Sequence, residues 1–196
     1  MDWLQNNAPL VSAAASVGMF VVWTFYAWLF YDGFRRQRAA QLVIHEAGGG
    51  RTGSTCLLVN LGQEPVHVLC SMAFRDGAGA RLHDTSGGED LPAIEQAKQG
   101  PLQVGASLTL GSFEGICRQL DDVARPPAQD DGGYLVEVCV AAVHGYTEWP
   151  IGARRRFSVD LSSSRVVPTS HMTEQLRSRR SASEVQSWVD ECHDRR

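Results

Sequence analysis

The chain has 196 residues, of which 43% are hydrophobic, and its 18 basic and 22 acidic side chains give a net charge of −4. This length suits one domain of ordinary size with a short appendage. The composition excludes a disordered chain, and the negative charge excludes a general binder of polyanions such as nucleic acids.

The first element expected in the chain is a membrane-spanning helix. Residues 3–31 carry no charge, and residues 8–31 are long and apolar enough to cross a hydrocarbon core of about 30 Å. Basic residues follow this run rather than precede it, and aromatic side chains occupy the place where a signal peptide would be cleaved. The pattern therefore favours a retained anchor over a cleaved signal. The residues assigned to the span include Pro9, Trp23, Trp28 and Tyr31.

The expected orientation depends on Arg35, Arg36 and Arg38, which lie directly after the span. Because basic residues stay on the cytosolic side, they predict an N-terminus outside the membrane, a cytosolic C-terminal domain and contact with anionic headgroups. Ala14 and Gly18 have the small-xxx-small spacing at which helices approach closely in lipid. The expected partners are the bilayer and either another membrane protein or a second copy bound through the span.

After residue 41 the hydrophobic period changes from helical to alternating, which predicts β-strands. The expected strands cover residues 41–46, 55–61, 66–74, 80–84, 106–113, 134–144 and 155–161. A helix is expected over 113–123, with Ser112 as its cap. Many short strands without alternating helices indicate an immunoglobulin-like antiparallel β-sandwich with a short C-terminal helix. The expected domains are an anchor (1–38), the sandwich (39–162) and a tail (163–196) with an amphipathic helix over about 182–193.

Alternating apolar residues identify the expected core face of three of these strands. They are Val66, Val68, Cys70, Met72 and Phe74 in the third strand, and Phe157, Val159 and Leu161 in the last. In the longest strand they are Val136, Val138, Val140 and Ala142, with Glu137 on the opposite face.

A family resemblance is carried by four segments, FYAWLFYDGFRRQR, CLLVNLGQEPVHV, GPLQVGASLTLGSF and WPIGARRRF. Together they resemble a group of small proteobacterial inner-membrane proteins with one span and a cytosolic domain. The similarity extends over residues ~1–161. It implies the topology and the immunoglobulin-like domain, and it brings no catalytic residues with it.

No residue pattern indicates a catalytic centre, a metal site or a cofactor. Residues 48–53 have the glycine spacing of a dinucleotide loop, but a strand pattern follows them, so a hairpin turn is expected. The five cysteines lack the paired spacing of a zinc site. Cys56 and Cys139 occupy the strands that carry the disulfide of antibody domains. A reducing compartment, and Glu137 on the face of Cys139, predict that these two thiols are not bonded to each other.

One candidate interface combines aromatic residues with the arginines that follow them, a composition enriched at protein interfaces. It consists of Tyr146, Trp149, Arg154, Arg155 and Arg156. In the alternative interpretation, Trp149 folds back over the end of the domain and the arginines are solvated.

A second candidate interface is the C-terminal helix. Ser181 and Glu184 have the spacing of a capping box, and an apolar stripe follows them. The stripe includes Val185, Trp188 and Val189. Because so short a helix is marginal in water, it must dock on the sandwich, a partner or the membrane surface.

These features predict a non-catalytic accessory or scaffolding protein that presents a cytosolic domain for protein–protein interaction at the membrane. The alternative is a regulatory or sensor subunit of a membrane channel, transporter or respiratory complex. An enzyme built on the sandwich is less favoured, because no catalytic pattern is present. No small-molecule substrate is expected.

Overall fold

The computed structural model describes residues 7–37, 39–75, 81–83, 100–123, 134–145 and 147–194. The chain divides into two compact units, Met1–Ala39 and Ala40–Arg196. Tyr146 and Arg38, which belong to the predicted sites, lie outside the described residues.

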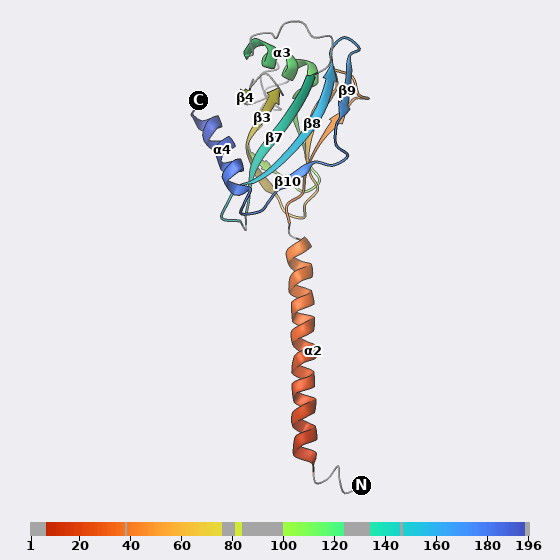
Figure 1. The fold of residues 1–196 in the computed structure, drawn as a ribbon, viewed down its shortest axis with the longest axis vertical. Coiled ribbons are helices and arrows are strands. Elements are labelled where there is room, and N and C mark those ends of the chain that lie inside the picture. The colour runs from red at the N-terminus through yellow and green to blue at the C-terminus, as the bar shows by residue number, and fades with distance from the viewer. Residues whose placement is uncertain are drawn as a thin grey trace. The chain divides into compact units, whose positions relative to one another are not determined.

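The first unit consists of helix α2 (Ala8–Gln37), drawn in red to orange in Figure 1. Its apolar part, Ala8–Phe34, has 27 residues, which is enough for a membrane span or a signal sequence. The hydroxyls inside it are satisfied locally, because Ser16 Oγ donates to the Ser12 carbonyl (2.9 Å) and Thr24 Oγ1 donates to the Phe20 carbonyl (2.8 Å). Most of its large apolar side chains make no buried contacts within this unit.

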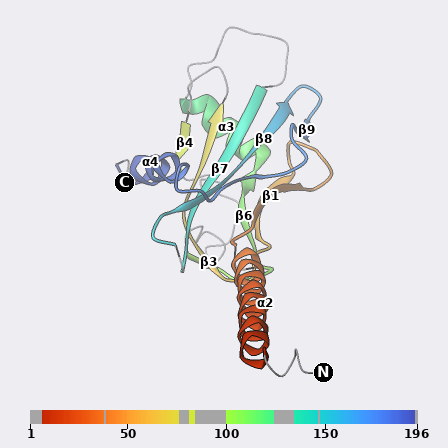
Figure 2. The ribbon, with the colours of Figure 1, turned by 60° about the horizontal axis from the view of Figure 1, so that its bottom comes forward.

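The second unit contains two antiparallel sheets (Figures 1 and 2). The first has the order β1-β2-β6, formed by β1 (Leu42–Ala47), β2 (Thr55–Asn60) and β6 (Ser107–Ser112). The second has the order β10-β8-β7-β3-β4, formed by β10 (Glu174–Leu176), β8 (Ile151–Asp160), β7 (Tyr134–His144), β3 (Val66–Arg75) and β4 (Arg81–His83). Beside these, β5 (Gly100–Leu102) pairs with β3, and β9 (Arg165–Pro168) pairs with β8. The prediction of a mainly antiparallel β domain is confirmed.

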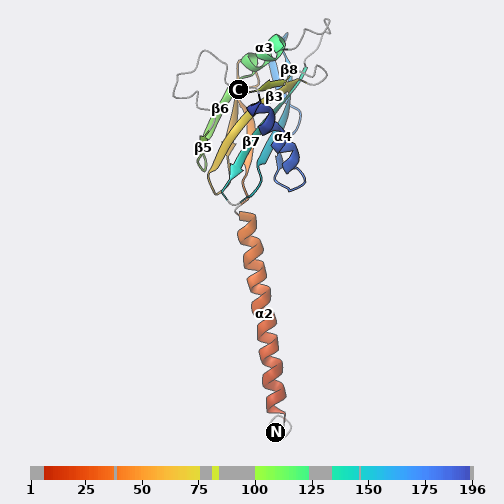
Figure 3. The same ribbon diagram turned by 90° about the vertical axis from the view of Figure 1, so that its left-hand side faces the viewer.

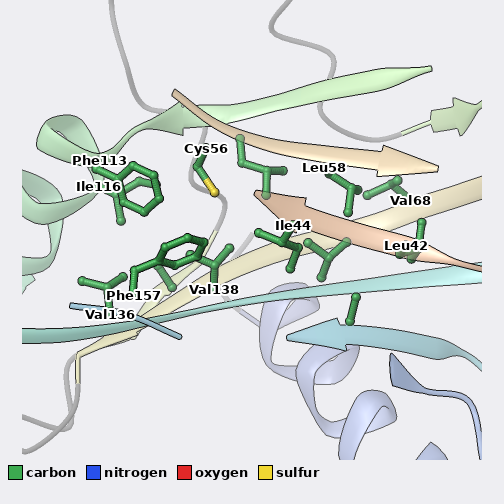
Figure 4. Packing of buried hydrophobic residues seen from close by; sticks show 14 of the residues in the cluster. Leu42, Ile44, Cys56, Leu58, Val68, Phe113, Ile116, Val136, Val138 and Phe157 are labelled. Atoms are coloured by element: carbon green, nitrogen blue, oxygen red, sulfur yellow. The ribbon is translucent and has the colours of Figure 1, made fainter. Parts of the chain in front are cut away.

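The two sheets pack face to face over a core that both supply. Figure 4 shows Ile44 and Leu58 from one sheet pointing toward Val138 and Phe157 from the other. The rings of Phe113 and Phe157 meet edge to face, with centroids 4.8 Å apart. The alternation predicted in β7 is confirmed, since Val136, Val138, Val140 and Ala142 are all buried in this core.

Strand β3 departs from the simple alternation that the sequence predicts. Its register with β7 passes from Val68↔Ala142 to Cys70↔Ala141, which marks a β-bulge between these positions. Val66 and Val68 therefore face the core, whereas Cys70 and Met72 face the opposite side of the sheet. The prediction of one shared face for the strand is wrong, because an extra residue inverts every side chain that follows it.

Helix α3 (Phe113–Val123) has the predicted bounds. Its cap is also confirmed, because the Gly115 amide donates to Ser112 Oγ (3.1 Å). The turn between β1 and β2 is the expected hairpin connection rather than a phosphate loop. Gly48, Gly49 and Gly50 all have positive φ, and a Cβ at Gly48 would lie 2.7 Å from the Ser54 Cβ.

The segment expected to be a tail, residues 163–196, belongs to the second unit instead. It supplies β9 and β10 to the larger sheet and then forms α4 (Ala182–His193), close to the predicted helix bounds. Leu161 was expected in the core but is 44% exposed, because β8 ends at Asp160 and the chain turns there.

Candidate functional site

The outer face of the larger sheet is covered by α4, as Figure 3 shows. The predicted apolar stripe is correct: Val185, Trp188 and Val189 are all buried. They pack against residues of β3 and β7, namely Cys70, Met72, Cys139 and Ala141. The helix therefore docks on its own domain, and its stripe is occupied by an intramolecular contact.

The start of α4 differs from the predicted capping box. Ser181 has helical backbone angles (φ −85°, ψ −9°), and its hydroxyl donates to the Ser178 carbonyl (2.9 Å) instead of accepting from the helix. Glu184 does not reach back to the Ser181 amide but accepts from Arg154 Nη1 (2.8 Å). Glu184 is engaged in an ion pair with Arg154, so it does not complete the capping box with Ser181.

The close approach of α4 requires a glycine in β8. A Cβ at Gly152 would lie 2.7 Å from Val185 Cγ2 and 2.9 Å from Trp188 Cζ3. Nothing in the local sequence pattern marks this glycine, because the helix that it accommodates lies 30 positions further along the chain.

The three consecutive arginines of the first candidate interface do not form one patch, because β8 alternates. Arg154 and Arg156 point to the outer face, where Arg154 binds Glu174 (2.7 Å) and Glu184 (2.8 Å) and Arg156 binds Glu137 (2.8 Å). The hydrogen bond with Glu174 raises the pKa of Arg154 above its usual value and lowers the pKa of Glu174. These arginines are engaged within the chain.

Arg155 points to the other side of β8 and connects the two sheets. Its Nη1 donates to the Ile44 carbonyl (2.7 Å), and its Cζ lies 5.6 Å from the centroid of the Phe157 ring. Desolvation by burial lowers the pKa of this guanidinium, which is stabilised by backbone carbonyls of Ile44 and Ser170 rather than by a carboxylate.

The open edge of β1 is closed by side chains that follow β9. The Ile44 amide donates to Thr173 Oγ1 (2.9 Å), and the Leu42 amide donates to Gln175 Oε1 (3.2 Å). Gln175 Nε2 donates in return to the Leu42 carbonyl. This edge is therefore protected from pairing with another strand. Sequence reasoning missed these residues because their partners lie about 130 positions away.

Trp149 folds back onto the end of the domain, as the alternative interpretation expected. It is partly buried, and its Nε1 donates to the Arg177 carbonyl (3.4 Å). The connection between β7 and β8 is thus held against the segment that links β10 to α4.

The outer face of the β1-β2-β6 sheet contrasts with the covered one. Strand register places two rows across it: Val43, Val59 and Ser107 in one, and His45, Leu57 and Thr109 in the other. All but the exposed Ser107 are partly exposed, and neither of the helices described in this unit, α3 and α4, packs over them. This surface, called here the bare face, is partly apolar and suited to a protein contact.

A second apolar surface lies on α2. Six side chains at helical spacing border an open groove of about 550 Å³. They are Trp23, Tyr26, Ala27, Phe30, Tyr31 and Phe34. Trp28 is outside this groove and stacks on Phe25, with ring centroids 6.4 Å apart. Of the other residues assigned to the membrane, Pro9 lies in the first turn of the helix, and Arg35 and Arg36 lie in its last turn.

The five cysteines are all in the described part of the chain, and none forms a disulfide. Cys56 points into the core between the sheets (Figure 4), whereas Cys139 lies under α4 on the other side of β7. The prediction that these two are not bonded is confirmed, because a sheet separates them. Burial raises the pKa of the Cys139 thiol.

Histidine and cysteine side chains meet at one small groove of about 100 Å³ between β3 and the end of α4. His67, Cys70, Cys192 and His193 line it. Within the described ranges, no three His, Cys, Asp or Glu side chains are arranged to hold a metal ion.

The chain matches no protein-family model, no curated protein and no solved structure.

Proposed function

We propose that the protein is a single-pass protein of a bacterial inner membrane, in which a cytosolic immunoglobulin-like domain acts as a non-catalytic docking module for another protein. The bare face of the β1-β2-β6 sheet is the docking surface. This proposal keeps the relationship to small proteobacterial membrane proteins that the sequence segments suggest.

Strand order supports the immunoglobulin-like assignment. In immunoglobulin sandwiches the first, second and fifth strands share one sheet, and the third, sixth and seventh share the other. Here β1, β2 and β6 form one sheet, and β3, β7 and β8 lie side by side in the other. The position of β4 beside β3 corresponds to the additional strand of variable-type domains.

The observation that carries the docking function is the difference between the two outer faces. The chain uses α4 to cover the larger sheet, and it leaves Val43, Leu57 and Val59 partly exposed on the smaller one. Half-apolar sheet faces of this kind bind partners through side-chain packing.

A photo-crosslinking amino acid at Val59 in cells tests the docking surface. We expect one discrete crosslinked product from Val59, lost when Leu57→Glu is added, and no such product from the matched position Val167, which is 41% exposed on β9. Equal products from both positions, or none from Val59, would contradict the proposed surface.

Orientation is tested separately with reporters fused to the C-terminus, after α4. Because Arg35, Arg36 and Arg38 follow the apolar helix, a fluorescent protein should be active there and a phosphatase that needs the periplasm should be inactive. The reverse result would place the domain outside and overturn the cytosolic assignment.

The groove on α2 favours a second candidate function, a regulatory or sensor subunit that docks on a larger membrane complex through its span. Ala27 is the small residue among five aromatic ones, so Ala27→Leu fills the groove, whereas Ala15→Leu adds the same bulk outside both the groove and the Ala14–Gly18 pair. If the groove holds a partner helix, only Ala27→Leu should disrupt a complex isolated in mild detergent.

A further inference from the structure

One end of the second unit gathers four connections. The amide of Leu42, at the start of β1, is hydrogen-bonded to the side chain of Gln175, and Leu176 pairs with Gly152 at the start of β8. The entry of the chain at Ala40, the β7–β8 connection and the segment between β10 and α4 therefore all lie at this end (Figure 1). The β2–β3 turn joins them, because a Cβ at Gly62 would lie 3.3 Å from the Ala40 Cα.

Basic side chains concentrate at this end beside Trp149. Arg177 is partly buried, and its Nε has no hydrogen-bond partner within the described structure. Arg179 and Arg180 are exposed and form no ion pair with any residue that the structure describes. Among the described residues of the β7–β8 connection and of the segment between β10 and α4, the only acidic side chain is Glu148.

One acidic group near this end is already engaged. Glu64, in the β2–β3 turn, lies 3.1 Å from His144 Nε2 and is mostly buried. The surface formed by Trp149, Arg177, Arg179 and Arg180, called here the entry patch, therefore carries an excess of positive charge. By contrast, the charges of Arg154 and Arg156, which lie on β8 itself, are neutralised by glutamates.

We propose that the entry patch binds the phosphate groups of anionic phospholipids, in the same membrane that α2 is proposed to cross. Guanidinium groups bind phosphate oxygens in pairs, and tryptophan favours the interface between headgroups and hydrocarbon. A tryptophan hydrogen-bonded to the backbone of Arg177, with the exposed Arg179 and Arg180 in the same segment, has the composition of such a surface.

Chain length favours lipid over a soluble anion. Ala40 follows Phe34, the last residue of the apolar stretch, by six positions, which extend to about 20 Å at most. A span in the bilayer therefore keeps this end of the domain at a high effective concentration of headgroups, so that even weak phosphate contacts are occupied. This inference depends on the proposed membrane anchoring and adds a surface for which that proposal has no role.

Hydrogen–deuterium exchange on the full chain in nanodiscs tests the inference. Residues 145–150 and 177–181 should exchange several-fold more slowly in phosphatidylglycerol discs than in phosphatidylcholine discs. The difference should disappear at about 1 M salt, where the Debye length is about 3 Å. Equal exchange in the two lipids would overturn the proposal.

Paired substitutions identify the residues that bind the lipid. Arg179→Gln with Arg180→Gln should abolish the lipid-dependent protection. Arg51→Gln with Arg165→Gln removes the same charge from the opposite end, where these two positions form a β-bridge, and should preserve it. Protection that survives the first pair of substitutions, or is lost with both pairs, would overturn the proposal.

Two further arms separate the sources of an effect. Inorganic phosphate added to phosphatidylcholine discs should give no protection, and protection there would identify a soluble-anion site and overturn the lipid assignment. If the chain fails to enter nanodiscs at all, the membrane anchoring itself is wrong. A chain that inserts without lipid-dependent protection overturns this inference alone.

Discussion

The two sheets of the domain have similar alternating patterns but opposite outer surfaces. Outside the larger sheet, Cys70, Met72 and Cys139 are at most 4% exposed because α4 lies on them. On the bare face, Val43 and Val59 stay partly exposed. Alternation in a strand therefore identifies two faces, but which of them is buried depends on elements far away in the chain.

The larger sheet is shaped to receive a helix. The bulge after Val68 turns Cys70 and Met72 outward, and Gly152 leaves room for the helix to approach. Ion pairs from Arg154 to β10 and to α4 border the contact. Among the described residues, the bare face has no comparable features for holding a helix. We therefore propose that it binds a partner protein rather than another segment of this chain.

The largest expected effect is the loss of Trp188, which anchors α4. Trp188→Ala removes a nearly buried aromatic side chain and should lower the free energy of unfolding by about 3 kcal/mol or more. Urea unfolding of the full chain in detergent measures this, and trypsin should cleave after Arg179 and Arg180 much faster. Gln186→Ala, on the exposed side of α4, is the control. Similar stability of the two variants would contradict the anchoring role.

A smaller effect is expected from the sheet side of the same contact. Gly152→Ala places a methyl group within 3 Å of Val185 and Trp188, so it should cost about 1–3 kcal/mol in the same measurement. Gly53→Ala is the matched control, because a Cβ there meets nothing within 4 Å. A neutral Gly152→Ala would show that α4 is held loosely.

The parts of this fold that sequence predicts are those encoded within a few residues. Helix α3 and its cap, the length of β7 and the stripe of α4 all follow from local periodicity, and the structure confirms them. Strands β9 and β10 were missed because they have three or four residues, too few for a period. The bulge in β3 has no sequence signal of its own.

The candidate site was less predictable for the same reason. Three neighbouring arginines suggest one basic surface, yet the strand sends Arg155 to one side and its neighbours to the other. The partners of these arginines, Glu174 and the Ile44 carbonyl, become visible only in three dimensions. The sequence left open whether Trp149 is an interface residue or folds back, and its contact with the Arg177 carbonyl spans 28 positions.

The bare face should contribute little to folding, and adjacent leucines in β2 test this. Leu57→Ala, on the bare face, should cost about 1–2 kcal/mol, because part of the side chain stays in water. Leu58→Ala, in the core, should cost about 2–5 kcal/mol. Urea unfolding of both variants gives the difference. Equal costs would mean that something covers the bare face within the chain itself.

The smallest effect is expected at the polar border of the covered face, in acid. Arg154 holds the pKa of Glu174 below its usual value of about 4.3, so ionisation of this carboxylate is favoured in the folded state. The stabilisation is complete above the unfolded pKa and is lost as pH falls through the lower, folded value.

Glu174→Gln should therefore lose about 0.5 kcal/mol at neutral pH, a small amount because the glutamate side chain is 57% exposed and screened by solvent. Between about pH 5 and pH 3 the stability of the wild-type chain should fall toward that of the variant, and the two should converge in more acidic buffer. Glu148→Gln, which removes an exposed carboxylate without an ion pair in the described residues, should keep the wild-type acid profile. If the stability of the Glu174→Gln variant changes with pH in parallel with that of the wild type over this range, the ion pair with Arg154 adds nothing to the attachment of β10. The covered face would then be held by the apolar contacts of Val185, Trp188 and Val189 alone.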